Sequence, residues 1–228
     1  IKSDGVPIKN MPSPLQINSR AIVPHHIFCV GKNYSEHIRE LKSEASESPV
    51  IFMKPVSSLL PVEKPIRVPD HGSVLHHEVE VVVLIGRAGK DIPENKVGAF
   101  ITGITLGIDL TLRDLQTKLK KRGLPWELSK AFDGSAPLGK FLPYDDSINL
   151  ADISFKCVVD RKICQKGNTA DMIFPIPFLI SYLSGIWELR PGDLIFTGTP
   201  AGVGPLHLGN KITIESDLTG TFTWEVKA

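Results

Sequence analysis

The stretch LHHEVEVVVLIG, residues 75–86, decides how this chain folds. Its run of valine, leucine and isoleucine, closed by a glycine, is typical of a strand that is buried on both faces. Glu78 and Glu80 stand two residues apart, so on a strand their carboxylates project from the same face. Like charges repel each other there, and an unpaired buried carboxylate is very costly. We therefore expect a cation beside this strand.

The sequence around this strand predicts many further strands and few helices. Strand-like patterns occur at 21–31, 50–55, 102–111, 153–160, 162–167, 193–198, 211–216 and 221–226, and helical ones at 33–44, 94–100, 112–123 and 175–186. The first helix has capping-box spacing at Asn33 and Glu36, and the third closes on Gly123. Because the strands outnumber the helices and do not alternate with them, we expect a mixed α+β, mostly β fold and not a doubly wound parallel sheet.

Length and composition favour one globular domain. The chain has 228 residues, 42% hydrophobic content and 18 prolines. The segment MPSPL near its start indicates a loose lead-in over residues 1–20, followed by a single domain at 21–228. The formal net charge of +1 gives no electrostatic footprint for nucleic acid or an anionic membrane, so neither is an expected partner.

Cysteine usage and hydropathy bear on the compartment. The three cysteines form no CxxC pair, which fits a reducing, cytoplasmic environment better than a disulfide framework or a thiolate zinc site. No apolar run approaches the roughly 20 residues that span a bilayer. The chain begins at Ile1, so a removed leader stays open as an alternative.

Carboxylates form the first candidate site. Asp109 closes the strand-like segment TLGID, and three carboxylates converge if that strand lies beside the one that Glu78 and Glu80 open. Oxygen ligands of this kind suit Mg²⁺, Mn²⁺ or Ca²⁺. The same spacing is equally compatible with two exposed glutamates and an aspartate that starts a turn. His76 and His77 fit a two-histidine iron site less well, because adjacent residues on a strand face opposite ways.

Two other groups could take part in catalysis. His37 and Glu40 share one face of a helix, where the carboxylate could orient a general-base imidazole, although a solvated pair has the same spacing. Lys130 lies between Trp126 and Phe132. That setting suits either an apolar pocket in which the lysine binds a substrate carboxylate or a lysine whose stem lies along the surface.

Two further features could bind anions. Arg113 and Gln116 are three residues apart on a helix and could hold an anion or be solvated. Gly198 and Thr199 belong to RPGDLIFTGTPAGVGP, residues 190–205, a glycine-rich loop whose backbone N–H groups can approach a ligand closely. A structural turn would use the same glycines, and the loop is no P-loop because the GK[ST] ending is missing.

Five segments, taken in order along the chain, resemble the fumarylacetoacetate hydrolase superfamily. They are CVGKNYSEHIRE, GSVLHHEVEVVVLIG, GIDLTLRDLQ, GLPWELSKAFDGSAPLG and GDLIFTGTPAGVGP, and the resemblance covers residues 22–226. Within the superfamily, the segments resemble the small single-domain branch of acylpyruvate hydrolases and oxaloacetate-handling enzymes. Each motif alone is unspecific, but their combination is specific.

This resemblance implies a β-roll with short peripheral helices, commonly assembled as a homodimer. It also implies a divalent ion, Mg²⁺ in the first place, held by Glu78, Glu80 and Asp109. Catalytic roles fall to His37 and Glu40 on a helix that covers the substrate, and to Lys130. Substrate contacts are expected at Lys32, Arg113, Gln116, Gly198 and Thr199. Lys32 stands where relatives often carry arginine, whose bidentate contact a lysine does not offer.

The expected activity is that of an enzyme acting on 2-oxo acids. The ion would chelate the carboxylate and 2-oxo group and stabilise an enolate. His37, oriented by Glu40, would activate water to attack the distal carbonyl of an acylpyruvate, and Lys130 would stabilise negative charge. Hydrolysis to pyruvate and a carboxylic acid is the first expectation. Tautomerisation or decarboxylation of oxaloacetate uses the same enolate, and a non-catalytic metal-binding scaffold is a remote alternative.

Overall fold

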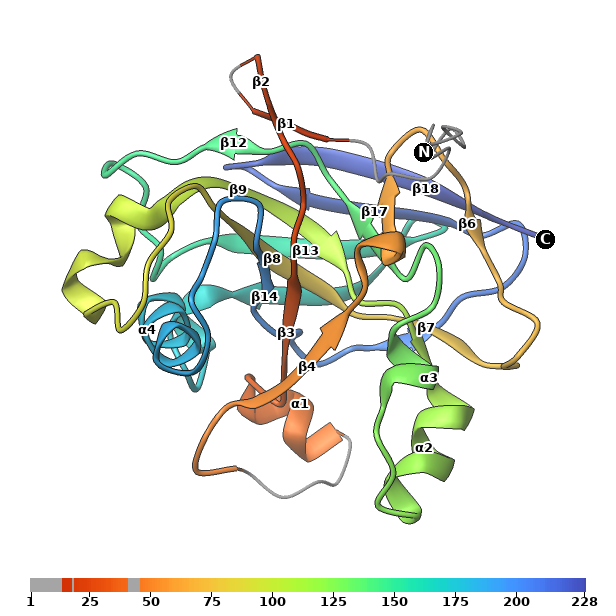
Figure 1. Cartoon of the computed structure of the whole chain (residues 1–228). Helices are drawn as coiled ribbons and strands as arrows, with labels where there is room; N and C mark the ends of the chain where they lie inside the picture. The colour runs from red at the N-terminus through yellow and green to blue at the C-terminus, as the bar shows by residue number, and fades with distance from the viewer. Residues whose placement is uncertain (1–13, 18, 41–45) are drawn as a thin grey trace, which may run out of the picture.

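The computed structural model describes residues 14–17, 19–40 and 46–228, and its centre is a curved eight-stranded sheet (Figure 1). The strand order is β4 (Val50–Lys54), β3 (Ile27–Gly31), β15 (Leu194–Phe196), β8 (Val79–Ile85), β9 (Ile101–Ile108), β11 (Ala136–Leu138) and β5 (Leu59–Pro61), with β12 (Leu142–Pro143) also pairing with β9. The pairs β15 with β3 and β11 with β5 are parallel, and the others are antiparallel.

Strand β8 is buried on both faces, as its sequence predicts. All seven of its residues are buried. Val79, Val81 and Val83 belong to one hydrophobic cluster, whereas Val82 and Leu84 belong to a second cluster on the opposite face. Because side chains alternate along a strand, the carboxylate of Glu80 lies on the face of the second cluster.

A second sheet covers the first cluster. Its order is β14 (Lys162–Asn168), β13 (Ser154–Val159), β17 (Lys211–Ser216), β18 (Gly220–Lys227) and β6 (Ile66–Arg67). Phe155, Ile214 and Trp224 of this sheet belong to the same hydrophobic cluster as the odd-numbered valines of β8. The predicted hairpin at 153–167 is confirmed, with β13 and β14 paired antiparallel.

A small sheet stands where the candidate carboxylates enter and leave their strands. It pairs β10 (Thr111–Leu112) with β7 (Leu75–His77), and β7 with β16 (Gly204–Pro205). Val79 is opposite Ile108 in the antiparallel pair of β8 and β9. The N–H of Asp109 donates to the carbonyl of Glu78 at 2.8 Å, so the two residues are held side by side.

Short helices flank the sheets, which confirms the mostly β class. Helices α1 (Ser35–Glu40), α2 (Arg113–Lys121) and α3 (Glu127–Lys130) lie below the central sheet in Figure 1, and α4 (Ile176–Ile186) lies at its side. Three 3-10 turns complete the described elements: η1 (Val56–Ser58), η2 (Glu94–Phe100) and η3 (Thr169–Asp171). Gly123 follows α2 with φ of +63°, the left-handed conformation predicted for it.

The short helix predicted at 94–100 is present as a 3-10 helix, η2. One local prediction differs from the structure. Asn33 does not cap α1, because its buried amide spans two other loops: it donates to the carbonyls of Phe174 and Thr197 and accepts from the N–H of Phe174. The end of the predicted helix, residues 41–44, lies outside the described residues.

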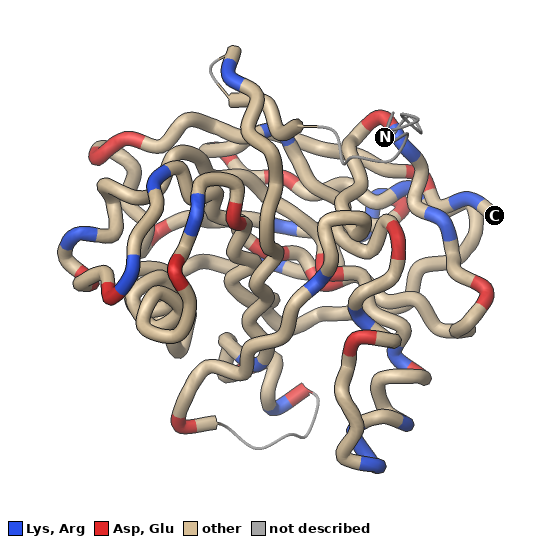
Figure 2. The backbone as a smooth tube through the Cα atoms, in the orientation of Figure 1, with Lys and Arg blue, Asp and Glu red and all other residues tan. Residues whose placement is uncertain are grey.

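The segment predicted as a loose lead-in, residues 1–20, contains ordered structure at its end. β1 (Leu15–Ile17) pairs with β2 (Arg20–Ile22), and Ile17 packs in the second hydrophobic cluster. Residues 1–13 and 18 lie outside the described residues. None of the described helices is long and apolar enough to cross a membrane. Acidic and basic residues are interspersed over the described chain (Figure 2).

Candidate active site

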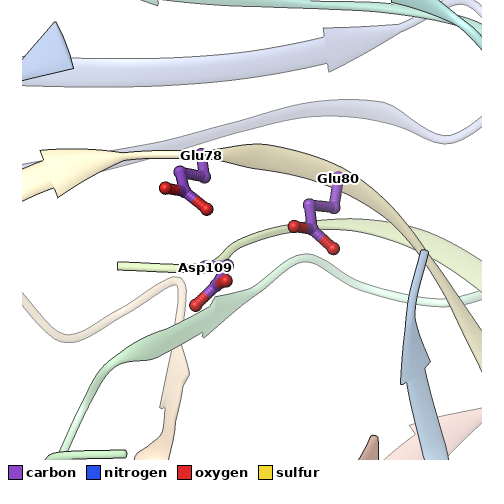
Figure 3. Close-up of side chains that lie close together, drawn as sticks. All are labelled: Glu78, Glu80 and Asp109. Atoms are coloured by element: carbon purple, nitrogen blue, oxygen red, sulfur yellow. The ribbon is translucent and has the colours of Figure 1, made fainter. Parts of the chain in front are cut away.

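Glu78, Glu80 and Asp109 form a buried carboxylate cluster. They are only 5%, 2% and 1% exposed. One oxygen of each lies within 4.8 Å of the others, and it is the one such cluster found in the described part of the chain. Figure 3 shows Glu78, just before β8, and Glu80, on β8, with Asp109 beside them. The alternative of two exposed glutamates and a turn aspartate is therefore wrong.

Three cations surround this cluster. Nζ of Lys130 donates to Glu78 at 2.7 Å and also to Asp109. Arg113 forms an ion pair with the other oxygen of Glu78. Nζ of Lys54 lies 2.8 Å from Asp109, and the Lys54 side chain is fully buried. The cationic environment predicted for the strand is thus supplied in part by protein side chains.

The donor set fits a divalent ion. Carboxylate oxygens at this separation are the ligands of a hard cation such as Mg²⁺ or Mn²⁺. Oδ1 of Asp109 is buried and accepts no aligned hydrogen bond, since Lys54 approaches it as an ion pair without hydrogen-bond geometry. Buried polar atoms normally have a partner, so this oxygen is suited to coordinate an ion.

The surroundings shift the pKa values of Glu78 and Glu80 in opposite directions. Burial alone would raise the pKa of Glu78, but Lys130 and Arg113 outweigh it and hold that pKa well below its usual range. Burial and the neighbouring Asp109 raise the pKa of Glu80, against a hydrogen bond from the N–H of Gly198. A bound cation would therefore favour the ionised form of Glu80, which forms no ion pair with a described residue.

The loop after β15 contacts the cluster directly. The N–H of Gly198 donates to Glu80 at 2.8 Å. Gly198 has φ of +102°, and a Cβ there would lie 2.6 Å from Cβ of Asn33, so only glycine fits. Thr199 is 4% exposed, and its hydroxyl donates to the carbonyl of Val79 at 2.9 Å. The glycines of this loop thus serve a close approach to the carboxylates.

His37 and Glu40 form a hydrogen-bonded pair on α1. Nδ1 of His37 lies 3.2 Å from Oε2 of Glu40, and His37 is 4% exposed. Because an ionised carboxylate only accepts hydrogen bonds, Nδ1 carries the proton and Nε2 is left with a lone pair. Burial lowers the pKa of His37, against the opposing effects of Glu78 and Glu40. The N–H of Gly202 donates to both oxygens of Glu40, at 3.1 and 3.2 Å.

These groups meet at one pocket. It is lined by Val30, Gly31, Lys32, His37, Phe52, Glu78, Glu80, Arg113, Gln116, Lys120, Trp126, Lys130 and Thr199. The remaining residues predicted for the site contact this wall: Asp109 through Lys130, Glu40 through His37 and Gly198 through Glu80. The predicted residues are therefore brought together in space.

Arg113 links two parts of the pocket. Besides its ion pair with Glu78, it donates to Oε1 of Gln116 at 2.6 Å. This bond leaves the amide N–H groups of Gln116 available as donors. The Nε of Arg113 lies 3.4 Å from Nδ1 of His76, and burial together with Arg113 lowers the pKa of His76 to about 4. His76 is thus a neighbour of the carboxylate cluster and not a member of it.

Three polar residues in or beside the site were not predicted. Lys54 ends a strand, and its burial could have been inferred from the alternation with Phe52. Lys120 lines the pocket with its Nζ 4.9 Å from the Trp126 ring centre, and no described residue forms an ion pair with it. Gln165 reaches the cluster from β14, which no local pattern indicates.

Comparison with known proteins places the chain in a family. The sequence pattern of the family described as fumarylacetoacetate (FAA) hydrolase C-terminal matches residues 26–227. The chain belongs to this family. The predicted resemblance is thereby confirmed, and the curled, mostly β fold is confirmed with it.

Relatives within the fumarylacetoacetate hydrolase family are named as enzymes. The chain is 44% identical over 198 residues to a mitochondrial oxaloacetate decarboxylase of Dictyostelium discoideum, covering 86% of this chain and 90% of the relative. It is 45% identical over 193 residues to the oxaloacetate tautomerase YcgM of Escherichia coli, covering 84% and 88%. The chain is accordingly an enzyme of this family.

A solved structure matches nearly the whole chain. It is a fumarylpyruvate hydrolase from Pseudomonas aeruginosa in complex with Mn²⁺ and pyruvate, with a TM-score of 0.92 and 33% sequence identity. The match covers 98% of this chain and 99% of that one. In that relative the fold therefore accommodates a divalent ion and a 2-oxo acid.

Proposed function

We propose that this chain is a divalent-metal enzyme that moves a proton at the carbon beside the 2-oxo group of a 2-oxo acid, with keto-enol tautomerisation of oxaloacetate as its first reaction. The observation that carries this proposal is the buried carboxylate cluster, with the hydrogen-bonded His37–Glu40 pair presenting His37 to the same pocket. The names of relatives at 44% and 45% identity support oxaloacetate as the substrate. The order of preference reverses that of the sequence analysis, which favoured acylpyruvate hydrolysis.

Glu78, Glu80 and Asp109 would hold the ion, for which we propose Mg²⁺. The bound ion would supply a Lewis acid that polarises the 2-oxo group. Lys130 is held by Glu78 and Asp109, which keep its pKa raised against the effect of burial. It therefore stays cationic and can stabilise negative charge on a substrate oxygen.

His37 would transfer the proton. Its Nδ1 is occupied by Glu40, so the lone pair of Nε2 is the group that can accept a proton from carbon. Because its pKa is lowered, the imidazole is neutral at physiological pH. Glu40, itself held by Gly202, fixes the ring orientation. Loss of this proton would leave an enolate, and the same nitrogen would deliver the proton to the enolate oxygen, which gives the enol. The reverse reaction would move the proton from that oxygen back to carbon.

A lysine that lines the pocket supports a substrate with two carboxylates. Nζ of Lys120 lies 4.9 Å from the Trp126 ring centre, and burial lowers its pKa, with smaller contributions from Lys32 and Arg113. A second carboxylate placed beside Lys120 would form an ion pair with it. Oxaloacetate carries such a group beyond its reacting carbon, whereas acetylpyruvate carries an uncharged acetyl group.

Hydrolysis of acylpyruvates is the second candidate, and the His37–Glu40 pair favours it. A neutral imidazole oriented by a carboxylate can activate water for attack on the distal carbonyl. Cleavage of the carbon–carbon bond would then yield pyruvate and a carboxylic acid. Decarboxylation of oxaloacetate, the reaction named for the Dictyostelium relative, is a third outcome of the same site.

One substrate panel tests these alternatives. Purified chain is assayed with Mg²⁺ and with EDTA for loss of enol absorbance and release of CO₂ from oxaloacetate, and for release of pyruvate from acetylpyruvate. We expect metal-dependent acceleration of the enol change, which His37→Ala reduces at least 100-fold. The exposed His207, changed to alanine, is the matched control. No metal-dependent change with any substrate would contradict the proposal.

Homodimer formation, which the family resemblance suggests, and a cytoplasmic location, which the cysteine usage suggests, remain proposals. A dimer would elute in size-exclusion chromatography with light scattering at twice the 25.0 kDa of the chain. Elution at the monomer mass across the working concentration range would contradict it.

A further inference from the structure

Gln165 connects the carboxylate cluster to the loop after β15. It lies on β14 and is 1% exposed. Its side chain crosses from the second sheet to the start of β8, where it meets the backbone of Val79. Val79 stands between Glu78 and Glu80 in the sequence, so this contact fixes the backbone that carries both of these carboxylates.

All hydrogen-bonding positions of the Gln165 amide are used. Oε1 accepts from the N–H of Val79 at 3.1 Å and lies 2.8 Å from Nδ1 of His77. Nε2 donates to the hydroxyl of Thr199 at 2.7 Å and to the carbonyl of Pro200 at 2.9 Å. Since a backbone N–H only donates, the atom that faces Val79 must be the oxygen, and the orientation of the amide is determined.

These bonds close a ring around Val79. Gln165 accepts from its N–H and donates to Thr199, and the hydroxyl of Thr199 donates to the carbonyl of Val79 at 2.9 Å. Both backbone groups of Val79 are therefore held by one buried network. The neighbouring N–H of Gly198 binds the carboxylate of Glu80, so the loop and the strand are positioned together.

We propose that Gln165 is a positioning residue for the metal centre. It holds the Glu78–Glu80 segment and the Gly198–Thr199 loop in register, so that the carboxylates converge at the spacing a divalent ion requires. This inference rests on the proposed function, because it presumes that the cluster binds such an ion. Groups that orient metal ligands from outside the coordination shell commonly contribute about 10- to 100-fold to metal affinity.

The proposal is tested by titrating the metal-free protein with Mn²⁺ alone in a calorimeter, well below the melting temperature. The measured quantity is the Kd for Mn²⁺. We expect Gln165→Met, which keeps the length of the side chain and removes every hydrogen bond, to raise the Kd at least tenfold. Gln165→Glu keeps an acceptor for Val79 and provides a second variant if the first does not fold. We expect it to raise the Kd less than the methionine variant does.

Ser184→Ala is the matched control. Ser184 is fully buried on α4, and its hydroxyl accepts from the N–H of Ile92 at 2.8 Å, away from the pocket. This variant should lower the melting temperature without changing the Kd for Mn²⁺. Gln165 variants that lose thermal stability but bind Mn²⁺ as the unmodified protein does would overturn the positioning role alone. Failure of the unmodified protein to bind Mn²⁺ would instead overturn the proposed function.

Discussion

Replacement of Lys54 by methionine should destabilise the protein strongly. The lysine side chain is fully buried and lies 2.8 Å from Asp109. It also donates to Ser135 at 3.1 Å, to the carbonyl of Leu110 at 3.3 Å and to the carbonyl of Lys130. Methionine preserves the apolar stem and removes the charge together with all of these bonds.

The expected loss follows from the burial of the pair. Removing one member of a buried ion pair leaves an uncompensated charge and typically costs about 3–5 kcal/mol of unfolding free energy. Asp109 retains Lys130 as a partner, which moderates the loss. The oxygens that accepted hydrogen bonds from Lys54 increase the loss instead. Each one that stays buried without a donor costs about 1–3 kcal/mol of unfolding free energy. We therefore expect a loss of about 4 kcal/mol for Lys54→Met.

Urea denaturation in EDTA measures this loss, with Lys156→Met as the control. Lys156 pairs with Glu215 at 2.6 Å, but the two side chains are 42% and 30% exposed. Exposed pairs contribute about 0–1 kcal/mol, so the control should be nearly as stable as the unmodified protein. A loss at position 54 no larger than that of the control would refute the reasoning. A double-mutant cycle with Asp109→Asn should give a coupling of at least about 1 kcal/mol.

Three shorter predictions concern the pocket. At saturating Mg²⁺, the acid limb of the pH profile of kcat/KM should have its midpoint below pH 6.5, because burial lowers the pKa of His37 and keeps the imidazole neutral. A midpoint above pH 7 would contradict the role of His37 as the base. Lys120→Met should raise the KM for oxaloacetate about tenfold and that for acetylpyruvate less than twofold, as steady-state kinetics can test. Gly198→Ala should reduce Mn²⁺ affinity at least tenfold, since the new Cβ would meet Asn33 and displace the N–H that binds Glu80. Unchanged Mn²⁺ binding in a calorimetric titration would count against the contact between Gly198 and Glu80.

Much of the fold follows from local periodicity. The unbroken apolar run after Glu80 predicts the burial of β8, and the two-residue period of a strand predicts the shared face of Glu78 and Glu80; the structure agrees with both. Whether Asp109 joins them depends on the pairing of β8 with β9, which places Val79 opposite Ile108. Spacing along one strand cannot fix the register between two strands, so the sequence alone left that choice open.

Two of the missed residues, Lys54 and Gln165, are held by contacts between distant parts of the chain. Gln165 and Val79 are 86 residues apart, and Lys54 and Lys130 are 76 apart. Asn33 shows the opposite error: local capping spacing is present, but bonds to Phe174 and Thr197 satisfy its amide instead. Tertiary partners compete with local ones for a polar side chain, and only the fold determines which partner it takes.

The balance of charge around the carboxylates bears on how the protein is made in a cell. Lys54, Arg113 and Lys130 form ion pairs with Glu78 and Asp109 within the folded chain. The third carboxylate, Glu80, accepts a hydrogen bond from the N–H of Gly198. In small zinc domains, by contrast, the ion supplies the folding free energy and the chain stays unfolded without it. We therefore expect this chain to fold without the ion, so that biosynthesis and metal loading would be separable steps. The supply of divalent ions would therefore control how many molecules are active, and not how many have folded.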